Sequence, residues 1–154
     1  MTSPIAHAAS IPNPRLAALE PFIGTWITGG HHPMMPGTVL HGRTTIEWLD
    51  GGAFLYMRSE IYDPRFPAGI AIIGSDDEAG TVTMLYFDQR EVSRRYEVTI
   101  GGGVIRWERT SPKLAQRFVL TISADGDRIH SVGEMSRDGG AWEPDLGLTY
   151  TRVK

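Results

Sequence analysis

The sequence predicts an all-β protein, a ten-stranded antiparallel up-and-down barrel with a short N-terminal helix closing its base. Short segments rich in valine, isoleucine, threonine and aromatic residues follow one another along the chain. Turn residues separate these segments roughly every 12 residues. Because no helical periodicity lies between them, a meander of strands is favoured over a sheet with crossover helices.

The one helix signal covers residues 13–21. Asn13 can cap the helix, Pro14 suits its first position, and Pro21 ends it. Two leucines give this helix an apolar side, Leu16 and Leu19. Residues 1–12 before it are broken by prolines and lack a basic segment, so we expect a disordered or extended tail rather than a signal peptide.

Everything after the helix is expected to be strand and turn, so that residues 13–154 form a single domain. The ten expected strands are residues 22–28, 39–49, 53–61, 69–75, 81–87, 93–100, 103–110, 116–124, 128–137 and 141–152. A barrel of eight strands is already wide enough to hold a small ligand, and a barrel of ten strands is wider.

The dipeptide Gly101-Gly102 predicts a tight hairpin and its register. A two-residue turn there pairs Tyr96 with Trp107 and Arg94 with Arg109, and places all four side chains on one face. The aliphatic residues on the same face are expected to be buried in the core, so we expect these four side chains to point into the barrel.

The connections distinguish the two ends of the barrel. Successive turns of a meander alternate between the ends, and one end receives the tight glycine turns. The other end receives longer loops rich in proline, methionine and arginine, at residues 31–38, 63–68, 88–92 and 111–115. Binding residues concentrate on such loops, so we interpret that end as the mouth. The helix, Trp26 and Arg152 belong to the opposite end.

Composition excludes several classes of function. The chain of 154 residues has a net charge of −3, which argues against a broad nucleic-acid surface. It contains no cysteine, so disulfides and cysteine-type zinc sites are excluded. No apolar stretch reaches the roughly 18 residues that span a membrane. We therefore expect a cytoplasmic protein, monomeric or homodimeric, without nucleic-acid or membrane partners.

Several short motifs resemble the calycin superfamily of lipocalins and fatty-acid-binding proteins, and most of all the bacterial calycin-like families of unknown function near the nitrobindins. The residues that carry the resemblance are Leu16-Ala17-Ala18-Leu19, Gly24-Thr25-Trp26, Leu49-Asp50-Gly51-Gly52, Asp138-Gly139-Gly140-Ala141-Trp142 and Tyr150-Thr151-Arg152. The resemblance implies that Trp26 packs under the barrel against Arg152, as a structural plug.

The same resemblance bears on the ligand. Nitrobindins hold haem with a histidine near the C-terminal strand, but residues 141–154 contain none. We therefore expect no haem and no other cofactor. Fatty-acid-binding proteins hold a carboxylate with interior arginine and tyrosine, to which Arg94, Arg109 and Tyr96 are similar in kind.

The candidate ligand-binding residues lie on the predicted inner face and in the mouth loops. Two inward arginines call for an anion, which a carboxylate or phosphate would supply; alternatively they reach water at the rim, or pair with Glu60 or Asp88. Exposed methionines in loops contact apolar ligands or pack the loop itself. The candidates are Arg94, Tyr96, Trp107, Arg109, Met34, Met35, Phe66 and Tyr86.

Three histidines map near the mouth: His31, His32 and His41. They could hold zinc or nickel, but no carboxylate at a suitable spacing completes a site, so we expect exposed loop histidines and no metal. No catalytic motif is present, and no residue is singled out as catalytic. The most consistent function is binding of a small, largely apolar ligand that can carry an acid group. The alternatives are an isomerase or cyclase acting in the cavity, and a haem protein.

Overall fold

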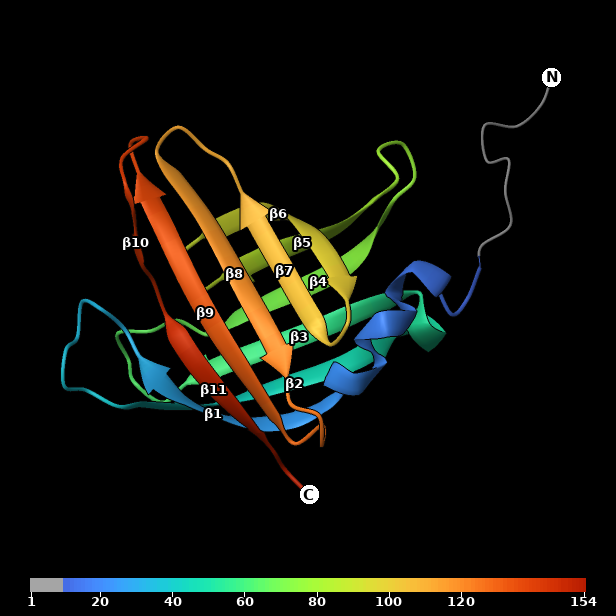
Figure 1. Ribbon diagram of the computed structural model, residues 1–154, viewed down its shortest axis with the longest axis horizontal. Helices are drawn as coiled ribbons and strands as arrows, with labels where there is room; N and C mark the ends of the chain where they lie inside the picture. The colour runs from blue at the N-terminus through green and yellow to red at the C-terminus, as the bar shows by residue number, and fades with distance from the viewer. Residues whose placement is uncertain (1–9) are drawn as a thin grey trace.

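The computed structural model describes residues 10–154, and residues 1–9 of the expected tail lie outside the described part. Two short 3-10 helices and eleven strands make up the fold (Figure 1). Their bounds are η1 Pro14–Phe22, β1 Gly24–His31, β2 Leu40–Leu49, η2 Asp50–Gly52, β3 Phe54–Ile61, β4 Gly69–Asp76, β5 Thr81–Asp88, β6 Val92–Gly101, β7 Val104–Arg109, β8 Leu114–Ile122, β9 Arg128–Arg137, β10 Trp142–Pro144 and β11 Gly147–Arg152.

The strands close into the predicted barrel. Each strand from β1 to β9 pairs antiparallel with the next, β9 pairs with β11, and β11 returns to β1. The short β10 pairs only with the end of β9, through residues 134–136. The ten-stranded antiparallel barrel with a short N-terminal helix is therefore confirmed.

Helix η1 lies across one end of the barrel (Figure 1). The Asn13 side chain accepts a hydrogen bond from the Arg15 amide at 3.0 Å, as a cap does. The helix does not end at Pro21 but continues to Phe22, which the sequence had suggested as the start of the first strand. Three of its side chains are fully buried in the core, Leu16, Leu19 and Phe22.

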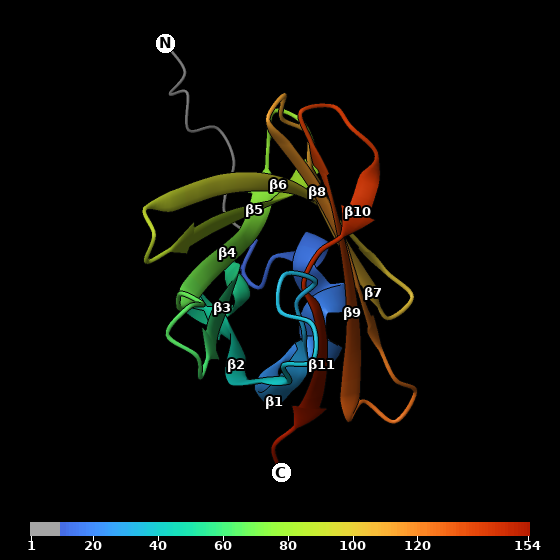
Figure 2. The same cartoon turned by 90° about the vertical axis from the view of Figure 1, so that its left-hand side faces the viewer.

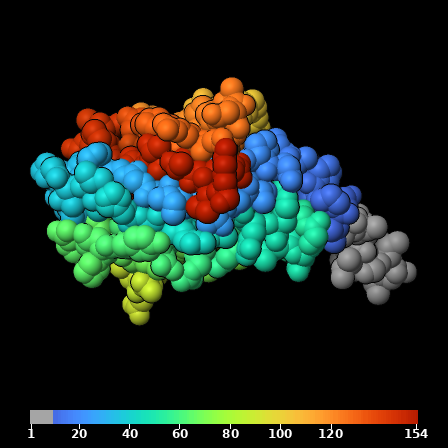
Figure 3. Space-filling model, turned by 90° about the horizontal axis from the view of Figure 1, so that it is seen from below, coloured from blue at the N-terminus to red at the C-terminus, as the bar shows by residue number. Residues whose placement is uncertain are grey.

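Trp26 and Arg152 meet under this helix. The Arg152 guanidinium lies 4.2 Å from the centre of the Trp26 ring, and Trp26 has no exposed surface. Arg152 donates hydrogen bonds to the carbonyls of Pro21 at 2.8 Å and Ile23 at 2.7 Å. One arginine therefore joins the last strand to the helix that precedes the first strand, and Figure 3 shows the C-terminal segment (red) beside the first part of the described chain (blue).

Gly24 is needed where it precedes this tryptophan. A Cβ atom added at Gly24 would stand 2.5 Å from Arg152 Nη1, which the carbonyls hold in place. The backbone φ of 149° is also unfavourable for other residues. The Gly-x-Trp spacing thus reflects the passage of Arg152 over the start of β1.

The β6–β7 register differs from the prediction by two residues. The turn is Gly102-Gly103, with φ of 60° and 74°, so Trp107 lies opposite Val98 instead of Tyr96. Gly102 and Gly103 both adopt the positive φ that a primed turn needs. Because residues 101–103 are all glycine, the sequence did not show which two of them form the turn. A shift of two residues preserves the face, so the inward orientation of Tyr96 and Trp107 survives.

The last expected strand is broken in two by a bulge at residues 145–146. Trp142 lies opposite Ser136, whereas Leu148 lies opposite Ser131, so one extra residue is inserted on this side of the ladder. The Asp145 carboxylate accepts a hydrogen bond from the Leu146 amide at 2.7 Å, which leaves the ladder there. The bulge reverses the faces: Trp142 points outward while Leu148 and Tyr150 point inward.

The two ends of the barrel carry different connections. Turns 77–80, 102–103 and 123–127 lie with η1 at the closed end. The loops after β1 and β3 extend from the other end, which faces the viewer in Figure 2. This is the end that the sequence identified as the mouth.

We predict that Trp26→Ala lowers the free energy of unfolding by about 3–5 kcal/mol, because it removes a fully buried indole from the closed end. Trp142→Ala is the matched control, since the Trp142 ring also stacks on an arginine, 3.9 Å from Arg117, but is 41% exposed. Urea denaturation of both variants measures the difference. Equal losses would show that Trp26 contributes no more than a surface cation–π contact.

Candidate functional site

A cavity of about 580 Å³ lies inside the barrel at the mouth. Its rim is formed by the loops after β1 and β3, and its floor by inward side chains of the strands. The plug residues Trp26 and Arg152 do not line it. The barrel interior is therefore packed at the η1 end and hollow at the other, and the volume is in the range that small-molecule sites occupy.

The floor and most of the wall are apolar. Met84 and Tyr150 are buried there, from opposite sides of the barrel, and Phe118 and Leu148 extend the apolar surface toward β9. Two polar groups, Thr44 and Ser59, lie among them with their hydroxyl oxygens 3.2 Å apart. One hydroxyl donates to the other, so each of these two oxygens takes part in a hydrogen bond.

A network of hydrogen-bonded polar side chains crosses one wall of the cavity, and Gln116 of β8 lies at its centre. The Gln116 Oε1 atom accepts hydrogen bonds from the Tyr96 hydroxyl at 2.8 Å and from Arg94 Nη1 at 3.1 Å. The Gln116 Nε2 atom donates to Asp145 Oδ2 at 3.0 Å. The amide thus lies between a cation and a carboxylate and orients both toward the cavity.

Tyr96 is held as a neutral phenol. Burial raises the pKa of the Tyr96 hydroxyl, and the nearby charges of Arg94 and Arg109 oppose this rise without cancelling it. The proton is therefore present at neutral pH, where it is donated to Gln116.

His32 extends this hydrogen-bond network to the loop after β1. Its Nδ1 atom accepts a hydrogen bond from the Met34 amide at 3.1 Å, which leaves Nε2 as the protonated nitrogen of the neutral ring. Nε2 lies 3.6 Å from Asp145 Oδ1, and the ring packs edge-on against Phe66 at 5.7 Å between centres. The loops after β1 and β3 are thereby tied to the bulge in the last strand.

A second tyrosine is anchored on the opposite wall. The Tyr86 hydroxyl donates to Asp88 Oδ2 at 2.8 Å, and Arg90 binds the same carboxylate through Nη2 at 2.7 Å. Burial, followed by the bond to Asp88, raises the pKa of Tyr86. The Asp88 side chain has no exposed surface. Its burial alone would raise its pKa, but hydrogen bonds from Arg90 and Tyr86 outweigh that and lower it.

The structure brings seven of the eight candidate ligand-binding residues to the cavity: Arg94, Tyr96, Trp107, Met34, Met35, Phe66 and Tyr86. Arg109 does not line it. In the observed register Arg109 follows Glu108, which pairs with Glu97, so it lies beside Tyr96 rather than beside Arg94. The expected pairing of Arg94 with Arg109 is therefore wrong: Arg109 pairs with Gln116 of β8, and the Gln116 amide is the partner of Arg94.

The mouth histidines separate into two kinds. His31 and His41 are exposed, as expected of loop histidines, whereas His32 is half-buried and lines the cavity. Within residues 10–154, no three histidine, aspartate or glutamate side chains are grouped as a metal ion requires. None of the helices in that range has the length and apolarity needed to cross a bilayer.

Sequence reasoning missed Gln116 and Asp145. Gln116 could have been found, because it alternates with Phe118 and Leu120 in an expected strand and is the polar member of that face. Asp145 could not, because it reaches the cavity through the bulge.

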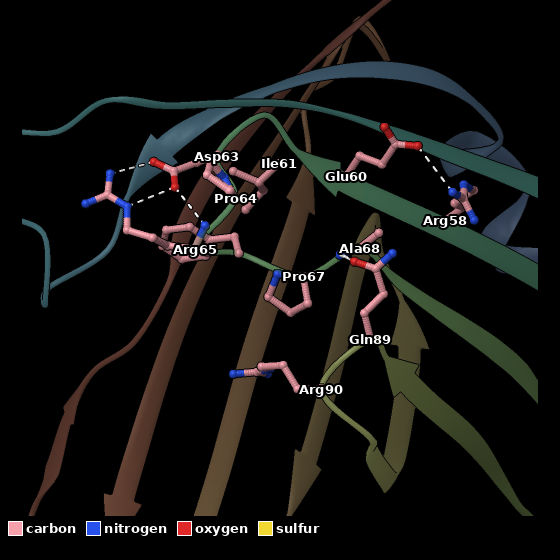
Figure 4. A pocket seen from close by; sticks show the side chains of 11 residues that line it. Arg58, Glu60, Ile61, Asp63, Pro64, Arg65, Pro67, Ala68, Gln89 and Arg90 are labelled. Atoms are coloured by element: carbon pink, nitrogen blue, oxygen red, sulfur yellow. Dashed lines mark hydrogen bonds and ion pairs between the residues drawn. The ribbon is translucent and has the colours of Figure 1, made fainter.

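A second hollow lies at the rim, between the loop after β3 and the turn after β5 (Figure 4). Its arginines are already paired: Arg65 with Asp63 at 2.6 Å, Arg58 with Glu60 at 3.3 Å, and Arg90 with Asp88. The bonds from Arg65 lower the pKa of Asp63 to about 2. This surface therefore offers no concentrated charge, and the inner cavity is the better candidate site.

We predict that Asp88→Asn weakens the fold at pH 7 by about 1–3 kcal/mol, because it removes the charge that Arg90 and Tyr86 satisfy. A lowered pKa stabilises the fold above the unfolded value of about 3.9, and this contribution is lost as the pH falls through the folded value. The difference between wild type and variant should therefore shrink below about pH 4.

Urea denaturation between pH 7 and pH 3 measures this difference. Asp77→Asn, which changes an exposed carboxylate in the turn after β4, controls for the change in net charge. A difference between wild type and Asp88→Asn that stays constant over this range would contradict the assignment.

Comparison with known proteins adds a fold relationship. No family model and no curated protein matches the sequence. Among solved structures, Rv2717c from M. tuberculosis superposes with a TM-score of 0.67 at 16% identity, over 94% of this chain and 100% of that one. A DUF3598 protein of unknown function from Nostoc punctiforme matches with a TM-score of only 0.29 at 8% identity, over 92% and 100% of the two chains. The first likeness shows that the two chains share a fold, a barrel that could hold a ligand.

Proposed function

We propose that the protein reversibly binds a small, largely apolar molecule carrying an acid group, inside the mouth of the barrel. The observation that carries this proposal is the cavity of about 580 Å³, apolar over most of its lining and provided with the guanidinium of Arg94. Apolar lining with a few placed polar groups is the usual composition of a ligand site.

The size of the cavity supports a resident molecule. The cavity opens at the mouth, so water contacts its apolar lining when no ligand is bound, and this contact is unfavourable. A ligand that filled the space would remove that apolar surface from water. The chain fills the closed end with three side chains of η1 and with Trp26, and provides no such filling at the mouth.

Arg94 supports the acid group. Its guanidinium has five N–H donors, and its hydrogen bond within the wall goes to the neutral oxygen of Gln116. The nearby carboxylate, Asp145, accepts from Gln116 Nε2 and from the Leu146 amide, and faces His32. Since donors already surround that carboxylate, Arg94 is the charged group with capacity for a ligand, and an acid oxygen would form charge-assisted bonds with it.

We also propose that the chain is a calycin-type protein of the kind that its motifs resemble. The contact of Trp26 with Arg152 beneath a closed ten-stranded barrel supports this assignment. Calycins mostly bind small molecules, which agrees with the use proposed for the cavity.

A second candidate is an isomerase or cyclase, and one observation favours it. The polar network that runs from His32 through Asp145 and Gln116 ends at the Tyr96 hydroxyl, which is a proton donor inside a largely apolar cavity. Such a hydroxyl could pass a proton to a bound substrate while Arg94 stabilised an oxyanion. Binding without turnover is the simpler use of these groups, and it remains the main proposal.

We predict that Arg94→Met weakens binding of the anionic probe 1-anilinonaphthalene-8-sulfonate by roughly 10- to 100-fold, the effect of losing a hydrogen bond to a charged group. N-phenyl-1-naphthylamine has the same skeleton without the sulfonate, so its affinity should change less than about twofold. Probe fluorescence measures both constants. Arg109→Met, which alters an arginine outside the cavity lining, is the matched control. Equal losses for both probes in Arg94→Met would refute the role of Arg94 in binding an acid.

A further inference from the structure

The methionines are concentrated in one place. The chain has six, and every one after Met1 lines the cavity. They come from β3, β5, β9 and the loop after β1, so they surround the space rather than share one strand: Met34, Met35, Met57, Met84 and Met135. Three of these side chains, Met57, Met84 and Met135, are buried.

The packed half of the barrel has no methionine. Its buried core residues that do not line the cavity are Leu16, Leu19, Phe22, Trp26, Ile46, Leu55, Ile73, Val98, Ile105, Leu120 and Ile129. Both halves are apolar, so hydrophobicity alone does not account for the difference. What methionine adds is a flexible side chain and a polarisable sulfur, which makes favourable contacts with aromatic rings.

One row of side chains joins these sulfurs to Arg94. Met57 pairs with Ala71, Ala71 pairs with Tyr86, and Tyr86 pairs with Arg94, on four adjacent strands at one level of the barrel. All four line the cavity. Adjacent strands lie about 4.8 Å apart, so Met57 and Tyr86 stand about 10 Å apart across the small side chain of Ala71. The row thus places its smallest side chain between a methionine and a tyrosine, and it ends at Arg94.

The next row adds a second methionine and a second tyrosine. Met84 pairs with Tyr96, one level closer to the closed end, and both line the cavity. A flat ring above Ala71 would therefore lie among Met57, Met84 and Tyr86, and Arg94 stands two strands away.

We propose that the ligand is an aromatic acid of one or two rings, with its ring above Ala71 and its acid group on Arg94. This inference rests on the proposed function of the cavity and narrows it to one chemical class. Sulfur–aromatic contacts contribute roughly a two- to tenfold gain in affinity each, and an aliphatic acid of the same size cannot make them.

The test compares two probes and two forms of the protein. Titration calorimetry gives the dissociation constants of 2-naphthoate and of decahydro-2-naphthoate, which keeps the carbon skeleton and the acid but lacks the aromatic ring. The measured quantity is the ratio of the two constants, in wild type and in the Met57→Leu/Met84→Leu double variant. Leucine has nearly the same volume and apolarity as methionine but lacks the sulfur.

We expect wild type to prefer naphthoate, and the double variant to lose that preference by roughly three- to thirtyfold while still binding decahydronaphthoate. Each single variant should lose part of the preference for naphthoate, so the test remains valid if the double variant is unstable. Leu120→Met is the matched control, because it makes the reverse exchange in the packed half, outside the cavity. It should leave the ratio unchanged.

The possible failures are distinguishable. If both probes bind wild type without a preference for naphthoate, the aromatic class is wrong and the proposed binding function stands. If wild type prefers naphthoate and the double variant keeps that preference, the sulfurs do not cause it and the inference from the methionines is wrong. If neither probe binds wild type, the binding function itself fails, and this inference fails with it.

Discussion

The structure depends on how the interior of a ten-stranded barrel is filled. In a barrel of about eight strands, the inward side chains of the strands fill the interior, whereas a ten-stranded barrel is wider and leaves space between them. Here η1 supplies Leu16, Leu19 and Phe22 to one end, and Trp26 completes the packing beneath Arg152. Because this filling is confined to the closed end, the mouth stays hollow. Arg152 donates to the carbonyls of Pro21 and Ile23, so the residue that covers Trp26 also joins the last strand to η1.

The polar groups of the mouth follow from the strands that carry them. Arg94 and Tyr96 are alternate inward residues of β6, and Gln116 meets both from β8. The bulge after β10 then brings Asp145 to the same amide. A cation, a neutral phenol and a carboxylate are thus arranged around one glutamine, and that geometry is set by the barrel rather than by a flexible loop. A site built on strands keeps its donors aligned before a ligand arrives, which reduces the ordering cost of binding.

The sequence predicted the fold well because its local signals agree with one another. Tight glycine turns and alternating strands led to the barrel, and the short helix with Trp26 and Arg152 located its closed end. The β6–β7 register was wrong by two residues, since Gly101, Gly102 and Gly103 all allow a turn, yet an even shift kept the faces. The site was harder to predict. Asp145 depends on a bulge that no local signal marks, and the separation of Arg109 from Arg94 depends on the register of β6 and β7. His32 differs from His31 and His41 only through contacts with Asp145 and Phe66, which are distant in the chain.

The central claim is that ligands enter the hollow end of the barrel, and the methionines provide the most direct measurement. With ¹³C-labelled methionine methyl groups, assigned by leucine substitutions, a two-dimensional NMR spectrum reports on the cavity wall during a titration with 2-naphthoate. The account predicts that the signals of Met57, Met84 and Met135 shift together and saturate at one dissociation constant, because all three are buried and line the cavity. Binding of naphthoate without any shift of these three signals would place the ligand outside the barrel and contradict the account.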